Sequence, residues 1–124
     1  EVFSSYSGKV RATGNTDEQC RGVSYGRWIL IDHPNNISTL YTHLLRNTVL
    51  AGDEVKKGER IGYTGQTGYA TGPHLHFAVF ATQAVQITSL NPGDSYYYKS
   101  RICGTPLYMP ISPPSGYLNP LSYL

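Results

Sequence analysis

Residues 27–43, RWILIDHPNNISTLYTH, decide the fold. The stretch RWILIDH (27–33) is rich in β-branched and aromatic residues and follows a glycine, which predicts a strand. PNN (34–36) is a turn, and ISTLYTH (37–43) alternates in hydrophobicity well enough to be the returning strand. These residues therefore predict an antiparallel β-hairpin.

The segments around this hairpin have the same strand-and-turn character. YSGKVRA (6–12) is predicted to form a turn and a strand, and HLHFAVF (74–80) another strand. Frequent glycines in LAGDEVKKGERIGYTG (50–65) disfavour a helix, so two short strands around tight turns are expected there. GQTGYATGP (65–73) is predicted to be a flexible loop. Because no window keeps the roughly 3.6-residue apolar period of a helix, the predicted fold class is all-β and antiparallel.

The C-terminal part of the chain is less regular. Residues 82–116 are rich in Tyr, Ser and Pro, and we expect an irregular excursion from a core sheet formed by residues 1–81. In the tail, 117–124, Asn119 followed by Pro120 pairs an N-cap with a first helical position, which predicts one short helical turn. The whole chain of 124 residues is predicted to be a single domain.

Composition argues against several classes of protein. The net charge is +2 and the ten Lys and Arg are scattered, so no basic stripe suits a nucleic-acid backbone. No apolar run is long enough to cross a membrane. The two cysteines, Cys20 and Cys103, are expected to form a disulfide in an oxidising compartment, with two unrelated buried thiols as the alternative. The disulfide is preferred because a chain this rich in Tyr, Gly, Ser and Thr is expected to be exported.

Two histidines, His74 and His76, stand one residue apart in an apolar run. Alternate residues of a strand point to the same face, so the two imidazoles are expected to project together. Leu75, Phe77 and Val79 would then face the core. A packed strand is a good platform for a metal or catalytic site, and the alternative is two partly exposed histidines bound to loop backbone.

The other two histidines lie near the ends of the predicted hairpin strands. His43 ends the returning strand, so it can meet His74 and His76 in one cleft. His33 ends the first strand at the edge of a turn, where solvation and local hydrogen bonds explain it. A zinc site of His33, His43 and His76 is an alternative that no spacing supports.

A different interpretation exists for GDEVKKGERIG (52–62). This stretch is similar to the half-barrel repeats of biotinyl and lipoyl carrier domains, which carry a modified lysine at an exposed hairpin tip. Nothing marks Lys56 or Lys57 as such a tip. A β-turn with solvated lysines is therefore the preferred interpretation.

Three stretches together resemble one known family. They are YGRWILIDHPNNISTLYTHL (25–44), GDEVKKGERIGYTGQTGYATGPHLHF (52–77) and NPLSYL (119–124). Their combination and order are similar to the lysostaphin-like, LytM-type zinc metallopeptidases, which cut peptide cross-links in bacterial peptidoglycan. The resemblance runs from about residue 6 to residue 81 and resumes at the tail. It implies an antiparallel β-sheet groove of the lysostaphin-like (duplicated hybrid motif) type, with peptidoglycan peptides as the substrate.

The resemblance also implies roles for three histidines. His76 would ligate zinc (Zn), whereas His43 and His74 would flank the metal-bound water as general base and transition-state stabiliser. The chemistry agrees, because zinc lowers the pKa of its water towards ~7 and nearby imidazoles can accept its proton.

The family's other two zinc ligands, a His and an Asp near the start of the domain, have no counterpart in residues 1–30. Asp17 has no partner histidine, since no histidine precedes His33. We therefore expect an N-terminally truncated zinc endopeptidase that, as 124 residues alone, binds zinc weakly and is inactive. The alternative is a degenerate, non-catalytic module that binds the cell wall or regulates other wall hydrolases. The three intact site histidines favour truncation.

Overall fold

The structure is a computed structural model that describes residues 1–90 and 107–123. In chain order its strands are β1 (Val2–Phe3), β2 (Gly8–Asn15), β3 (Arg27–Asp32), β4 (Ile37–Asn47), β5 (Glu54–Val55), β6 (Arg60–Thr64), β7 (His76–Ala81), β8 (Gln86–Leu90), β9 (Leu107–Ile111) and β10 (Tyr117–Leu118). Three 3-10 turns accompany them: η1 (Thr16–Glu18), η2 (Pro114–Gly116) and η3 (Pro120–Tyr123). The described residues contain no α-helix, which confirms the all-β prediction. The predicted terminal turn is η3, where Asn119 Oδ1 accepts a hydrogen bond from Leu121 N at 3.1 Å.

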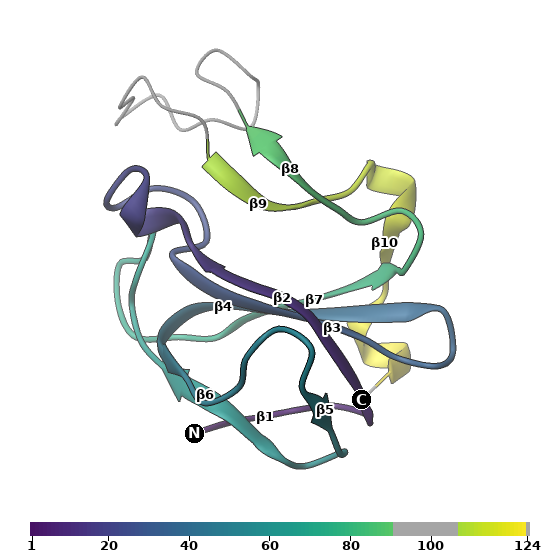
Figure 1. The fold of residues 1–124 in the computed structure, drawn as a ribbon. Coiled ribbons are helices and arrows are strands. Elements are labelled where there is room, and N and C mark those ends of the chain that lie inside the picture. Colours follow the sequence, from purple (N-terminus) through teal and green to yellow (C-terminus); the bar gives the residue numbers. More distant parts are fainter. Residues whose placement is uncertain (91–106, 124) are drawn as a thin grey trace.

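The main sheet is built on the predicted hairpin of β3 and β4 (Figure 1). The two strands pair antiparallel, with Asp32 opposite Ser38 and Arg27 opposite Leu44. The strand order is β1-β6-β4-β3-β2-β5, while β7 pairs with β4 and β10 pairs with β7. The two short strands expected in residues 50–65 are β5 and β6.

β4 changes its pairing partner part-way along its length. Its first part, residues 37–42, pairs with β7, and its last part, from Leu44 to Asn47, pairs with β6. His43 lies between the two pairings. The predicted strand ends at His43, whereas β4 continues beyond it to Asn47. The change of partner opens a fork between β6 and β7, and His43 stands at its base.

Alternate residues of β3 face two separate apolar cores. Ile29 and Ile31 pack with Tyr41 and with residues of β1, β5 and β6 on one face. Trp28 and Leu30 pack on the other face with residues of β4, β7 and the β7–β8 turn. Full burial of such a side chain contributes about 1.5–3 kcal/mol, so β3 and β4 are held rigidly from both sides.

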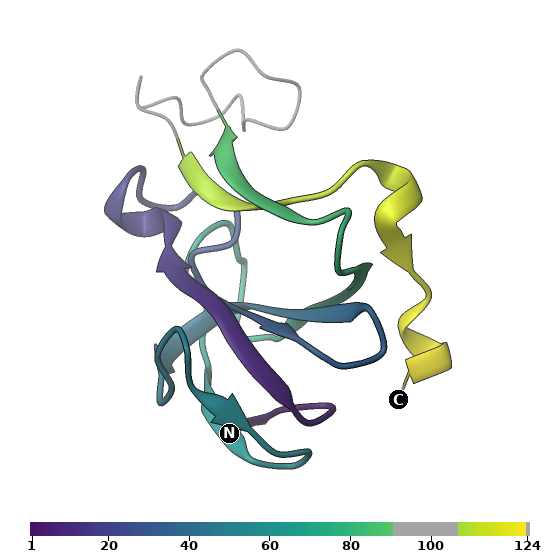
Figure 2. The same cartoon turned by 45° about the vertical axis from the view of Figure 1, so that its right-hand side comes forward.

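A second, two-stranded sheet lies over the second face. β8 and β9 pair antiparallel from Gln86 opposite Ile111 to Leu90 opposite Leu107. Figures 1 and 2 show this pair on one side of the central strands β2, β3 and β4, with β1, β5 and β6 on the other side. The described parts of residues 82–116 therefore contain two regular strands, β8 and β9, which the expected irregular excursion did not include. The two strands lie far apart in sequence, so no short turn signal marks them as partners.

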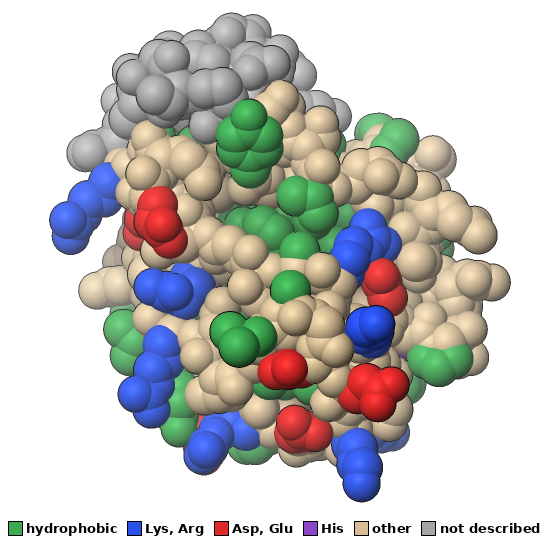
Figure 3. Space-filling model, in the orientation of Figure 1, with side chains coloured by type: hydrophobic (Ala, Val, Ile, Leu, Met, Phe, Trp, Pro, Cys, Tyr) green, Lys and Arg blue, Asp and Glu red, His purple; other side chains and the backbone are tan. Residues whose placement is uncertain are grey.

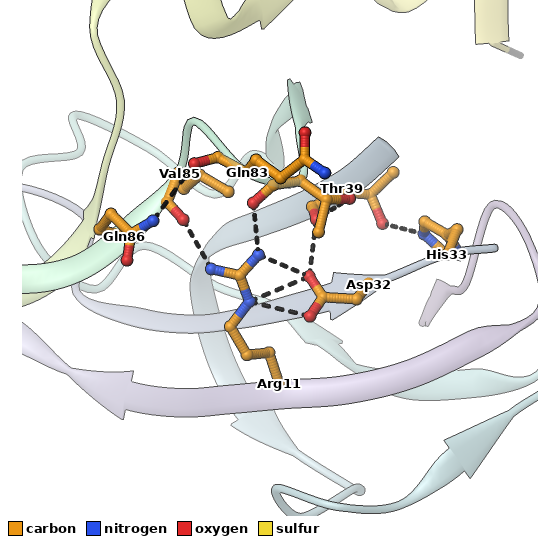
Figure 4. Close-up of polar contacts among 9 residues, drawn as sticks. Arg11, Asp32, His33, Thr39, Gln83, Val85 and Gln86 are labelled. Carbon is orange, nitrogen blue, oxygen red and sulfur yellow. Dashed lines mark hydrogen bonds and ion pairs between the residues drawn. The ribbon is translucent and has the colours of Figure 1, made fainter. Parts of the chain in front are cut away.

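An ion pair fastens the start of the second sheet to the first (Figure 4). Arg11 Nε lies 3.0 Å and 2.9 Å from the two carboxylate oxygens of Asp32. The terminal nitrogens of Arg11 donate to Val85 O at 2.6 Å and to Thr82 O at 2.9 Å, and Ser38 Oγ donates to Asp32 at 2.6 Å. The planar guanidinium can make these bonds at once, so it ties the β7–β8 turn to β2 and β3.

Four further expectations concern surface and covalent features. Cys20 is disulfide-bonded, and Cys103 lies outside the described residues, so the pairing of the two stays a prediction. Lys56 and Lys57 are exposed in the turn between β5 and β6. Figure 3 shows charges of both signs interspersed on the face drawn. Within residues 1–90 and 107–123, no helix has the length and apolarity needed to cross a membrane.

Candidate functional site

Three of the four histidines converge at the fork between β6 and β7. The ring centroid of His43 lies 4.7 Å from that of His74 and 6.1 Å from that of His76. His43 comes from β4, His76 is the first residue of β7, and His74 lies in the preceding loop. The structure thus brings together the three histidines that the sequence singled out.

The surroundings of His74 differ from the predicted strand 74–80. β7 begins only at His76, and Leu75 is 39% exposed instead of facing the core. His74 forms an isolated bridge with Gly65, to whose carbonyl its backbone N donates at 3.1 Å. The loop therefore holds His74, and the strict alternation of a strand does not apply to the residue that follows it.

His33 lies at the opposite end of the β3–β4 hairpin. Its side chain is buried, with Nδ1 2.8 Å from Ser7 O and Nε2 2.8 Å from Thr39 Oγ1. The hairpin separates it from the other histidines by roughly 15–20 Å, at ~3.3 Å per strand residue. The alternative zinc set of His33, His43 and His76 is therefore wrong. The structural role of His33 comes from buried hydrogen bonds rather than from solvation.

The backbone of His43 has a left-handed conformation, with φ at 59°. For a residue with a bulky side chain, such a conformation costs about 1–2 kcal/mol. Two hydrogen bonds hold it in place: His43 N donates to Tyr25 O at 2.8 Å, and Gly65 N donates to His43 O at 3.1 Å. The kink turns the imidazole out of the regular strand and into the fork.

Loop carbonyls orient the rings of His43 and His74. Nδ1 of His43 lies 2.7 Å from Thr67 O, and Nδ1 of His74 lies 3.0 Å from Gly72 O. Because a carbonyl oxygen can only accept, each Nδ1 carries a proton, and Nε2 of each neutral ring is unprotonated. Both imidazoles therefore have a free lone pair that can accept a proton.

His76 differs from its two neighbours in its ring contacts. Within the described part of the chain its ring nitrogens have no hydrogen-bond partner, and its ring lies 6.2 Å from that of Tyr25. A neutral imidazole with unengaged nitrogens is the commonest metal ligand in proteins. His76 is thus the member of the cluster best suited to bind a metal.

The surroundings favour neutral rings. Burial lowers the pKa of His43, and its hydrogen bond to Thr67 O opposes this only in part. Loss of hydration, together with the neighbouring His74, lowers the pKa of His76. A metal ligand and a general base both need an unprotonated nitrogen, so these shifts suit either role at neutral pH.

A complete metal centre needs more than this cluster supplies. In residues 1–90 and 107–123, no group of three His, Cys, Asp or Glu side chains is placed to hold a metal ion. A catalytic zinc takes three protein ligands and an open position. The residues present therefore fit one ligand of a zinc site and not a whole site.

Sequence reasoning missed the residues that position the loop 65–73. Thr67 Oγ1 donates to Leu44 O at 2.8 Å and accepts from Arg27 N at 3.0 Å, so it ties the loop to β4 and β3. Asp17, which has no histidine partner in the sequence, contacts the backbone of the same loop. The available signal was the repeated Thr-Gly in TGYATG, because a polar side chain before a glycine is typical of a backbone-bound turn.

Two open surface cavities flank the main sheet. One of about 490 Å³ is lined in part by Thr67 and Leu45, which adjoin His43. The other, of about 590 Å³, lies near His33 and is lined in part by Glu54 and Lys56. The smaller of the two borders the loop that orients the imidazole of His43, but none of the three clustered histidines lines either cavity.

A curved antiparallel sheet that brings histidines together at a strand fork is typical of a metallopeptidase, and comparison with known families leads to the same class. The profile of Peptidase family M23 matches residues 1–92, and the chain belongs to this family. Among curated relatives, the peptidoglycan DD-endopeptidase ShyA of Vibrio cholerae is 46% identical over 52 residues. These are 42% of this chain and 12% of ShyA. The first curated relatives match over only 11% to 20% of their own length.

Solved structures show the same fold. The catalytic domain of the antimicrobial peptidase lysostaphin from Staphylococcus simulans is 35% identical, with a TM-score of 0.57 over 65% of this chain and 58% of that chain. A zinc-containing peptidase from Vibrio cholerae is also 35% identical, with a TM-score of 0.55 over 62% of this chain and 22% of that chain. These likenesses confirm the lysostaphin-like resemblance and the fold class.

Proposed function

We propose that this chain is the sheet-forming part of a zinc-dependent endopeptidase that hydrolyses peptide cross-links of bacterial peptidoglycan. The observation that carries the proposal is the convergence of His43, His74 and His76 on one fork, with lone pairs free on their rings. Membership of Peptidase family M23 and the similarity to ShyA support the reaction and the substrate class.

The three histidines have different tasks in this proposal. His76, whose ring nitrogens are unengaged, is a metal ligand. His43 and His74 carry their protons on Nδ1, so each offers Nε2 to accept a proton from an attacking water and to return it to the leaving amine. The loop carbonyls that fix both rings also fix their tautomers, which keeps the acceptor nitrogens in place between turnovers.

The metal needs two further ligands, and in this proposal they come from residues outside the 124-residue chain. When bound, a zinc ion supplies Lewis acidity and an activated water. The structure of a zinc-containing peptidase with the same fold supports the choice of metal. The chain of 124 residues alone is therefore expected to bind zinc weakly and to be inactive.

The substrate sets the proposed location. Peptidoglycan lies outside the cytoplasmic membrane, so the protein is extracellular or periplasmic, in the cell envelope. The disulfide at Cys20 supports an oxidising compartment.

The test uses the complete gene product and purified peptidoglycan. We expect soluble fragments and new free amino groups, both abolished by a metal chelator and restored by zinc. His43→Ala and His74→Ala should each lower the rate about 10²–10⁴-fold, which is the usual contribution of a general acid–base residue. Lys56→Ala, an exposed change remote from the cluster, is the matched control and should leave the rate unchanged.

The incomplete ligand set favours a second candidate, a non-catalytic module that binds the cell wall or regulates other wall hydrolases. Such a module would co-sediment with peptidoglycan and release nothing, with or without zinc. That result for the complete gene product would contradict the enzyme and support the module.

A further inference from the structure

We infer that Asp17 is a positioning residue for His43 and acts through the peptide group that joins Thr67 to Gly68. This inference rests on the proposed function, because the orientation of His43 matters only if its Nε2 takes part in a reaction. Asp17 is not itself a catalytic residue, since it holds the group that holds the ring.

The carboxylate of Asp17 binds the N–H side of that peptide group. Gly68 N donates to Oδ1 and Oδ2 of Asp17 at 3.2 Å and 3.1 Å, and Gly22 N donates to Oδ1 at 2.9 Å. The backbone of Asp17 is anchored as well, because its N donates to the N-cap side chain of η1, Asn15 Oδ1, at 3.0 Å. The carboxylate is thus fixed between its own loop and the loop beside the histidines.

The carbonyl side of the same peptide group binds His43. The C=O of Thr67 and the N–H of Gly68 belong to one trans peptide unit, so they point in opposite directions. Thr67 O lies 2.7 Å from His43 Nδ1. A carboxylate at the N–H end polarises the peptide and makes its carbonyl a stronger acceptor. Asp17, the peptide and His43 therefore form a chain that fixes the tautomer without any proton having to move.

The peptide group has little freedom to shift. Gly68 has φ at 70°, and a Cβ on it would clash with Gly26 N and Ser24 O. Gly26 has φ at 64° and is equally short of space against Thr67. Only glycine allows two loops to approach this closely at positive φ. Steric contact thus limits where the carbonyl can lie, and the charge of Asp17 strengthens its bond to the imidazole.

The test compares Asp17→Ala with Asp17→Asn by ¹⁵N spectroscopy of the histidine rings in the 124-residue chain. At a pH of about 8, well above the usual imidazole pKa, the wild type should show His43 as the Nδ1–H tautomer. Asp17→Ala should shift His43 towards a mixture with the Nε2–H form. The matched control is Asp53→Ala, which removes a similar bond, from Leu50 N at 2.8 Å, in an exposed loop away from the cluster. Its His43 spectrum should equal that of the wild type.

Asp17→Asn keeps the test decisive if the alanine variant does not fold. Its amide oxygen can still accept from both backbone donors, so the tautomer should persist, but without the charge the Nδ1–H resonance should move upfield. In the complete gene product, Asp17→Ala should lower kcat about 10- to 100-fold, as loss of a residue that orients a site residue commonly does. KM should change by less than about twofold, and Asp17→Asn should recover most of kcat.

An unchanged His43 tautomer in Asp17→Ala, or an unchanged Nδ1–H resonance in Asp17→Asn, would overturn the inference. A failure of the proposed function looks different. In that case the complete wild-type protein releases nothing from peptidoglycan, while the His43 tautomer still depends on Asp17.

Discussion

Each end of the β3–β4 hairpin holds a buried histidine. The two histidines differ in how many of their ring nitrogens are hydrogen-bonded within the protein. His33 and His43 are both 6% exposed. His33 uses both nitrogens, one on Ser7 O and one on the hydroxyl of Thr39. His43 uses only Nδ1, and its ring centroid lies 4.7 Å from that of His74 and 6.1 Å from that of His76. Burial of a histidine therefore does not mark a site, whereas a nitrogen left without a partner does.

The backbones of the two ends also differ: pairing is regular at His33 and interrupted at His43. His33 N donates to Ile37 O at 2.9 Å, which closes the hairpin in the ordinary way. His43 has φ at 59° and lies where β4 changes its partner from β7 to β6. Regular pairing satisfies a strand completely, so the end at which pairing breaks is the end that can present a side chain for chemistry.

The largest expected effect is the loss of stability when His33 is removed, compared with the loss when His74, a histidine of the cluster, is removed. His33→Ala leaves Ser7 O and the Thr39 hydroxyl without their buried partner and creates a cavity, which should cost about 2–4 kcal/mol of the free energy of unfolding. His74→Ala removes an exposed side chain and should change it by less than about 0.5 kcal/mol. Urea unfolding of both variants measures the difference, and equal losses would remove the distinction between a structural histidine and a histidine of the cluster.

Protonation of His33 should have a smaller effect on the free energy of unfolding than its deletion. Burial lowers the pKa of His33, although the hydrogen bond to Ser7 O and the charge of Asp32 oppose this. The unfolded chain, with an imidazole pKa of about 6.5, then binds the proton more readily than the folded one. Stability is therefore fully present above a pH of about 6.5 and is lost as the pH falls towards the lowered folded pKa.

The measurement is the free energy of unfolding at a pH of about 7.5 and of about 5.5. His33→Gln removes this titrating group, so its loss of stability between the two pH values should be smaller than that of the wild type. An equal loss in the variant would assign the effect to His43 and His76, whose pKa values are also lowered.

Local patterns were enough to predict the strands on which the site is built. The hairpin of residues 27–43 is present because stretches rich in β-branched and apolar residues lie on both sides of a short polar turn. The short strands in residues 50–65 and the terminal turn after Asn119 also follow from local turn and cap chemistry. Phe77 and Val79 pack inwards as predicted, since they lie within β7 proper.

The rest depends on contacts between segments that are distant in sequence. The conformation of His43 results from the change of partner along β4, which no single-strand pattern encodes. The pairing of β8 with β9 and the contact of Asp17 with Gly68 join residues that only the folded chain brings together. The sequence could therefore predict which histidines come together, but not what orients their rings.

The smallest effect tests whether the backbone at His43 is strained. A Cβ is unfavourable at a φ of 59°, so His43→Gly should be more stable than His43→Ala by about 1 kcal/mol, although both lose the ring. His74 is not among the residues with positive φ in the described chain, so the same pair of substitutions there should give the opposite sign, with glycine about 0.5–1 kcal/mol less stable than alanine. Chemical denaturation of the four variants gives both differences. The same sign at both positions would mean that His43 is not held in a left-handed conformation, and the fork would then need another explanation for the direction of its imidazole.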